Sequence, residues 1–174
     1  MRKTTSVLSA IVVSTMIFAY QAEAQVIDQT TATAEAGVTA EVIQPIAIAK
    51  NADLSFGRFS VAAEGTVVIP ADGSARTQSG GVLLPVGLAA GSRAQFTVTG
   101  DEAATYSVTM PADGVIVLSD GDSNTMDLSD FESTSTGNLV DGTEIIYVGA
   151  TLNVADNQAA GSYSGTFDVI VDYN

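Results

Sequence analysis

The chain has 174 residues, of which 20 are acidic and 6 are basic, and its formal charge is −14. It contains no Cys, Trp or His, which excludes disulfides, thiol and imidazole catalysis, and zinc sites built from Cys and His. So negative a charge also argues against binding to nucleic acid, which requires Lys and Arg to displace counterions from the phosphates.

The first 24 residues have the layout of a secretory signal peptide. Arg2 and Lys3 precede an apolar stretch from Val7 to Tyr20, and residues 22–24 (Ala-Glu-Ala) form a small-x-small cleavage motif. The apolar stretch is shorter than the ~20 residues of a membrane-spanning helix. We therefore expect export, with no transmembrane segment once residues 1–24 are removed, and one domain in the remaining chain.

Apolar and polar residues alternate from Thr31 to Val42, a pattern typical of a strand with one buried face. A strand of this length is long compared with the usual five or six residues. The apolar positions are Ala32, Ala34, Ala36, Val38, Ala40 and Val42. The pattern fits a donor arm that pairs outside its own domain, or the domain's own first strand. Alternation alone does not separate the two.

The rest of the chain predicts short strands divided by Gly, Asp, Asn and Ser. Residues 70–73 (Pro-Ala-Asp-Gly) are a strong turn signal, and Pro85 indicates an edge or a bulge. The predicted strands are residues 46–48, 54–56, 66–69, 75–78, 82–88, 95–99, 106–110, 115–118, 146–154 and 163–173. We expect mostly loop over residues 119–143. Because no segment shows a 3.6-residue period, the fold class predicted is all-β, an antiparallel sandwich or barrel.

A weak calcium motif lies in the acidic stretch. The sequence from Asp120 to Asn124 matches the opening of a calcium loop, but the sixth position is Thr125 rather than Gly and the twelfth is Phe131 rather than Glu. The weak candidate ligands are Asp120, Asp122, Asn124 and Asp127. A solvated acidic loop is the favoured interpretation, and we expect no cofactor.

Carboxylate catalysis is the remaining enzymatic class. A glycosidase needs two carboxyl groups facing each other across a cleft, usually with aromatic residues to hold the sugar. Most acidic residues here fall in predicted turns or on outward strand positions, such as Asp168 and Asp172, and Trp is absent. We expect no enzymatic activity.

Five stretches, taken in order, resemble a family of secreted bacterial β-sandwich proteins related to the fimbrial and spore-coat-protein-U-like subunits of chaperone–usher pili. These stretches are residues 52–57 (ADLSFG), 96–100 (FTVTG), 104–109 (ATYSVT), 147–154 (YVGATLNV) and 161–174 (GSYSGTFDVIVDYN). Pilus subunits also carry a Gly fourteen residues from the C-terminus and a penultimate Tyr, which match Gly161 and Tyr173. Many of these relatives have a disulfide, and this chain cannot form one.

The resemblance implies an incomplete immunoglobulin-like sandwich, residues 39–174, that lacks one strand. Residues 25–38 are then the candidate donor strand, with Ala32, Ala34, Ala36 and Val38 as its inserting side chains. The implied acceptor groove runs beside the C-terminal strand, along Gly161, Tyr163, Phe167, Val169, Val171 and Tyr173. Main-chain hydrogen bonds give such strand addition its affinity, and alternate side chains fill pockets.

The resemblance also implies partners and a location. The expected function is a structural subunit of an extracellular fibre, pilus or surface assembly that transits the periplasm and has a role in cell adhesion. The expected partners are copies of itself or sister subunits, with a periplasmic chaperone and an outer-membrane usher during assembly. The alternative is a self-contained secreted sandwich that binds a glycan or calcium.

Overall fold

The computed structural model describes residues 31–174, so the predicted signal peptide and residues 25–30 of the candidate donor strand lie outside the described residues. The chain divides into two units, Met1–Ala40 and Glu41–Asn174. In the first unit, residues 31–40 have no regular secondary structure and all their side chains are exposed. The strand predicted from Thr31 to Val42 is therefore not formed. Alanine-rich alternation has little apolar area to bury, and a strand also needs a neighbour for its backbone.

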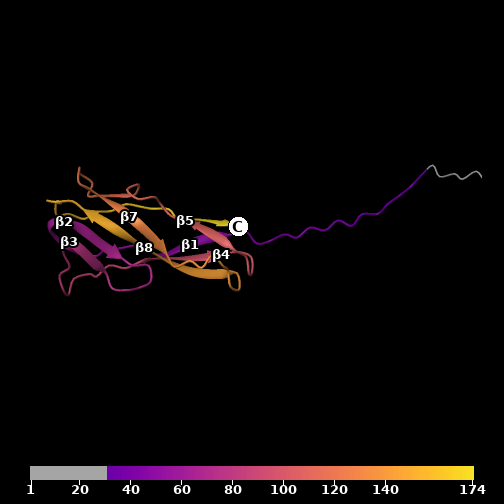
Figure 1. Cartoon of the computed structure of the whole chain (residues 1–174), viewed down its shortest axis with the longest axis horizontal. Helices are drawn as coiled ribbons and strands as arrows, with labels where there is room; N and C mark the ends of the chain where they lie inside the picture. The colour runs from indigo at the N-terminus through magenta and orange to yellow at the C-terminus, as the bar shows by residue number, and fades with distance from the viewer. Residues whose placement is uncertain (1–30) are drawn as a thin grey trace, which may run out of the picture. The chain divides into compact units, whose positions relative to one another are not determined.

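Residues 41–174 form an all-β unit, as the sequence predicts, and every strand pair in it is antiparallel. Its strands, labelled in part in Figure 1, are β1 (Ala47–Ala52), β2 (Ser60–Ile69), β3 (Thr77–Leu83), β4 (Ala94–Thr99), β5 (Tyr106–Thr109), β6 (Val117–Ser119), β7 (Thr125–Ser133), β8 (Thr143–Val154) and β9 (Ile170–Tyr173). In the described part of the chain, no helix is long and apolar enough to cross a membrane.

The long strand β8 organises the larger sheet. Its first half pairs with β4 and its second half with β2, and β7 lies along the opposite edge. Val148 shows this arrangement, because it is paired with Ala94 of β4 on one side and with Ser133 of β7 on the other. β1 extends the sheet beyond β4, β3 extends it beyond β2, and β6 pairs with β7.

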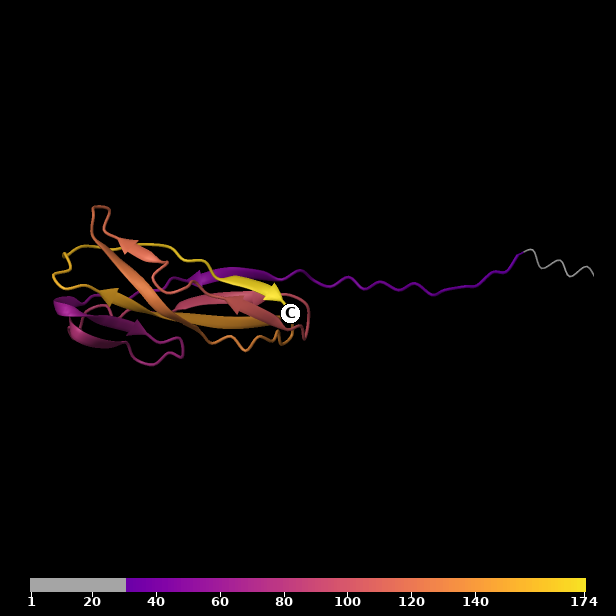
Figure 2. The same ribbon diagram turned by 45° about the horizontal axis from the view of Figure 1, so that its top comes forward.

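A second, two-stranded sheet of β5 and β9 covers the half of the larger sheet that contains β4 (Figure 2). Phe96 and Val98 of β4 and Ile146 of β8 pack there against Tyr106 of β5 and Val171 of β9. The other half of the molecule has a second buried cluster around β2, β7 and the end of β8. Phe131 and Leu54 pack against both clusters, so the core is continuous.

The structure departs from several predictions about local structure. The expectation of mostly loop over residues 119–143 missed a strand, because β7 occupies Thr125–Ser133 within that stretch. Met126 and Leu128 face the core while Asp127 and Ser129 alternate with them, so the acidic residues mark the outer face of a strand. Residues 54–56 form no strand, only a single backbone bridge between Ser55 and Ser92.

Candidate strand-binding groove

A groove of about 1000 Å³ opens into the core of the sandwich. One wall is the segment between β1 and β2, and the other is the C-terminal segment from Gln158 to Phe167. Side chains of β4, β6, β7 and β8 form the floor. The volume equals that of roughly thirty waters at liquid density, enough for a peptide segment.

The groove is lined with large apolar side chains that remain partly exposed. Those that pack against the buried clusters without being fully covered are Leu54, Phe59, Val61, Ile116, Leu118, Tyr163 and Phe167. Contiguous exposed apolar surface in a folded domain marks an interaction site. The lining is therefore suited to an apolar partner.

Both walls of the groove also have unpaired backbone. β1, whose Lys50 and Ala52 line the groove, pairs only with β4. Upstream of β9, residues Tyr163–Val169 form no strand, and Ser164 makes only a two-way backbone bridge to Ser119, at 2.9 Å in each direction. An open row of N–H and C=O groups beside apolar pockets provides both elements that strand addition uses.

The structure divides the predicted acceptor residues into two sets. Gly161, Tyr163 and Phe167 line the groove. Val169, Val171 and Tyr173 do not line it, and they pack instead against the buried cluster under β5 and β9. Phe167 joins the two sets, since its ring is 6.3 Å from that of Phe96 in an edge-on arrangement and 5.2 Å from that of Phe131.

Tyr173 fastens the end of β9. Its hydroxyl donates a hydrogen bond to the carbonyl of Gln44 at 2.7 Å and accepts one from the backbone N–H of Asp101 at 2.6 Å. Gly100 leaves room for this ring, because a Cβ there would lie 2.3 Å from the hydroxyl and 2.8 Å from Leu139. The penultimate tyrosine thus ties the C-terminal strand to the residues just before β1.

Sequence reasoning missed the wall opposite the C-terminal segment. Leu54 and Phe56 alternate, and then Gly57 adopts a positive φ of 69° and shifts the alternation by one residue, so that Phe59 and Val61 line the groove. Arg76 holds this turn by donating hydrogen bonds to the backbone carbonyls of Phe56 and Arg58. The one-residue shift across a Gly is the signal available in the sequence.

The predicted donor residues lie in the other unit. Ala32, Ala34, Ala36 and Val38 are all exposed, and Val38 retains 93% of its accessible surface. None belongs to a strand. Their side chains are therefore available to a partner.

The candidate calcium ligands do not form one site. Asp120 accepts hydrogen bonds from the side chain of Asn124 at 2.6 Å and from the backbone of Asp122 at 2.9 Å, and these bonds, that of Asn124 first, lower the pKa of its carboxyl. Asp127 instead accepts a bond from Asn153 at 2.8 Å. Between residues 31 and 174, no group of three or more metal-binding side chains occurs.

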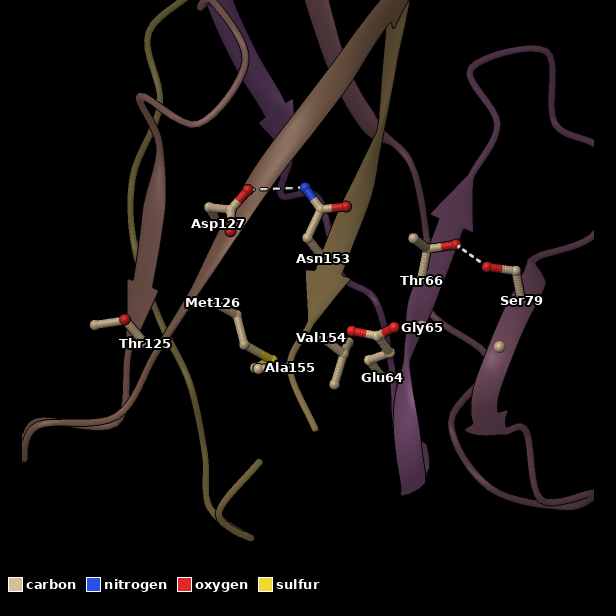
Figure 3. Close-up of a pocket in the computed structure, with 11 residues that line it drawn as sticks. Glu64, Gly65, Thr66, Ser79, Thr125, Met126, Asp127, Asn153, Val154 and Ala155 are labelled. Carbon is tan, nitrogen blue, oxygen red and sulfur yellow. Dashed lines mark hydrogen bonds between the residues drawn. The ribbon is translucent and has the colours of Figure 1, made fainter. Parts of the chain in front are cut away.

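A shallower hollow of about 490 Å³ lies over β2, β3, β7 and β8 (Figure 3). Its polar side chains are largely bonded to one another: Thr66 to Ser79 at 2.7 Å, and Asn153 to Asp127. Asn153 also donates to Ser129 at 3.1 Å. These bonds tie neighbouring strands together and leave few free groups for a ligand.

A partly buried polar network surrounds the hydroxyl of Tyr106 in β5. The Tyr106 hydroxyl donates to the carboxylate of Glu144 at 2.5 Å and accepts from Ser135 at 2.9 Å. Burial, and then the bond to Glu144, raise the pKa of Tyr106 to about 12. The network links β5 to β8 and stabilises the half of the molecule that β9 covers.

Comparison with known proteins identifies one family. No curated protein and no solved structure matches the chain. A family model described as a domain of unknown function, DUF4402, matches residues 46–173, which include all nine strands and both walls of the groove. Over that range, the chain belongs to the DUF4402 family.

Proposed function

We propose that this protein is a non-enzymatic structural subunit of an extracellular fibre or surface assembly, and that it polymerises by β-strand donation. The arm of one copy, residues 25–38, lies in the groove of the next as an added strand. The open groove is the observation that carries this proposal: it combines exposed apolar side chains with the free edge of β1 and a C-terminal wall that forms no strand. The added strand completes an immunoglobulin-like sandwich.

The division of the chain supports an exchangeable arm. The compact unit begins at Glu41 and the family match begins at Ile46, so the arm lies outside both. The four inserting side chains, Ala32, Ala34, Ala36 and Val38, are exposed, and insertion removes them from water together with the groove lining. The donor side chains are small and contribute only about 4 kcal/mol of apolar burial. Backbone hydrogen bonds and coverage of the larger groove residues supply the rest.

Two forms of the protein test the proposal: residues 25–174 and residues 39–174, of which the second retains the compact unit. We expect the longer form to assemble, as measured by size-exclusion chromatography with light scattering. The shorter form should remain monomeric. A saturating peptide of residues 25–38 should raise its melting temperature by an amount on the order of 10 °C.

A peptide with Ala34→Asp is the matched control, because it places a charge on the inserting face without changing the length. It should leave the melting temperature unchanged. Two equally stable monomers, neither of which responds to the wild-type peptide, contradict strand donation.

A further inference from the structure

The described chain has four cationic side chains, and three of them are engaged within the sandwich. Lys50 binds Asp53, Arg76 binds the carbonyls of Phe56 and Arg58, and Arg93 binds the carbonyl of Ala71 and stacks on the ring of Tyr147. The fourth is Arg58. Its side chain is exposed on the groove wall and has no hydrogen-bond or ion-pair partner among residues 31–174. Within the described residues, it is thus an unpaired cation at the groove of a strongly acidic protein.

The alternating part of the proposed donor, residues 31–38, has a single charged residue, Glu35. It lies on the face opposite the alanines, so insertion of the alanines turns Glu35 toward the mouth of the groove. An arginine and a carboxylate form paired, charge-assisted hydrogen bonds. Glu35 and Arg58 are complementary in charge, and an inserted arm would present Glu35 on the solvent-facing side, where Arg58 is exposed.

The alanine pattern defines the register of the donated strand only weakly. A shift of two residues leaves alanine at two of the four inserting positions, and the main apolar change is that Val38 moves to another pocket. A shift of one residue turns Glu35 into an apolar groove, where an unpaired charge is strongly unfavourable. A charged group on the opposite face therefore adds a second distinction between registers that differ by two residues.

We propose that Glu35 of the donated arm pairs with Arg58 of the accepting subunit and fixes the register of the added strand. This proposal depends on the strand donation proposed above. It makes Arg58 a specificity residue, one that selects donor strands with a carboxylate at the matching outward position. Donor segments of similar apolar pattern that lack this carboxylate bind more weakly and in several registers.

Peptide binding to residues 39–174 tests the pair. Arg58→Gln in the protein and Glu35→Gln in the peptide should each weaken binding about fivefold, and the two changes together should be no worse than either alone. Arg58→Glu should weaken it further, and a Glu35→Arg peptide should restore it. Lys50→Gln is the matched control, since it removes the same charge from the same wall but from a side chain already paired with Asp53.

Disulfide cross-linking measures the register of the bound peptide directly. The chain has no cysteine of its own, so only introduced cysteines can react. The protein carries Ser162→Cys on the groove wall, and separate peptides carry one cysteine at position 31, 33 or 37. One peptide should dominate the disulfide yield with Arg58 present. With Arg58→Gln, the yield should spread over positions two residues apart.

The outcomes separate the two proposals. If the wild-type peptide does not bind, strand donation is wrong. If it binds, but Arg58→Gln and Lys50→Gln have equal effects and the cross-linked position does not change, only the Glu35–Arg58 pair is wrong.

Discussion

The two halves of the C-terminal segment have the same sequence pattern and different structures. In both, residues that face the core alternate with exposed ones, from Tyr163 through Phe167 to Tyr173. β9 has four residue pairs with β5 and the hydroxyl bonds of Tyr173, whereas residues 163–169 have one backbone bridge. The difference shows that alternation determines which face is buried, but a strand also needs a partner along its edge. The half without one lines the groove.

The largest loss of stability is expected at Gly100, which lies against the Tyr173 ring at the end of β9. Gly100→Val places a side chain where the Tyr173 ring lies, and we expect a loss of about 3 kcal/mol in the free energy of unfolding. Urea denaturation measures it. Gly37→Val is the control, since a Cβ at Gly37 meets nothing within 4 Å. If the two variants are equally stable, the Tyr173 ring is not packed tightly against Gly100, and the prediction is wrong.

Alkaline pH should weaken the same half through Tyr106. Its pKa is raised from 10.0 to about 12, so its stabilising contribution is complete below pH 10 and is lost as the pH rises through 12. By pH 11.5 this loss is about 1 kcal/mol, because solvent screens the partly exposed groups around the hydroxyl. Tyr106→Phe should lower stability at pH 9 by about 1 kcal/mol. The gap between variant and wild type should then close by pH 11.5, and a constant gap contradicts the assigned cause.

Removing the Phe167 ring from the groove-lining half, residues 163–169, should lower the stability less than Gly100→Val does. Phe167→Ala deletes a partly exposed side chain that contacts Phe96 and Phe131, so we expect a loss of about 2 kcal/mol rather than the larger cost of a fully buried ring. Thermal and urea unfolding measure it. Ile170→Ala, on the exposed face of the same segment, should change stability by less than about 0.5 kcal/mol. If the exposed residue matters as much, the assignment of faces is wrong.

The smallest expected effect comes from removing the hydroxyl of Tyr173 alone. Tyr173→Phe keeps the ring and removes the bonds to Gln44 and Asp101, for a loss of about 1 kcal/mol. Hydrogen exchange should show faster exchange at the Asp101 amide, which loses its acceptor. It should be unchanged at Ser164, whose bridge to Ser119 is independent. A faster exchange at both amides indicates that the two halves open together.

The sequence predicted the fold where local chemistry and pairing agree. Residues 70–73 suggested a turn, and the structure has β2 and β3 on either side of it, with Asp72 accepting a bond from the backbone of Ser74 at 2.8 Å. β8 follows the alternation predicted for residues 146–154. β7 was missed because its outward positions are acidic, and its stability depends on distant groups such as Asn153, which binds Asp127.

The groove was only half predictable. The alternation of the C-terminal segment placed Tyr163 and Phe167 on the core side, and both line the groove. The opposite wall depends on the positive φ of Gly57 and on hydrogen bonds from Arg76, a residue that lies far along the chain. Such long-range contacts leave no periodic pattern. For the same reason, the lack of a partner for Arg58 among the described residues becomes apparent only when the partners of the other cations are known.

The bond between Tyr173 and Gln44 has a mechanical consequence. In a fibre built by strand donation, tension on the arm enters the domain at Gln44, three residues before β1. The load divides there between the end of the C-terminal strand and the β1–β4 ladder, whose hydrogen bonds are perpendicular to β1 and resist a pull along that strand. Several of these bonds must break together before the strand moves. The point where the arm leaves the domain is thus reinforced against stretching.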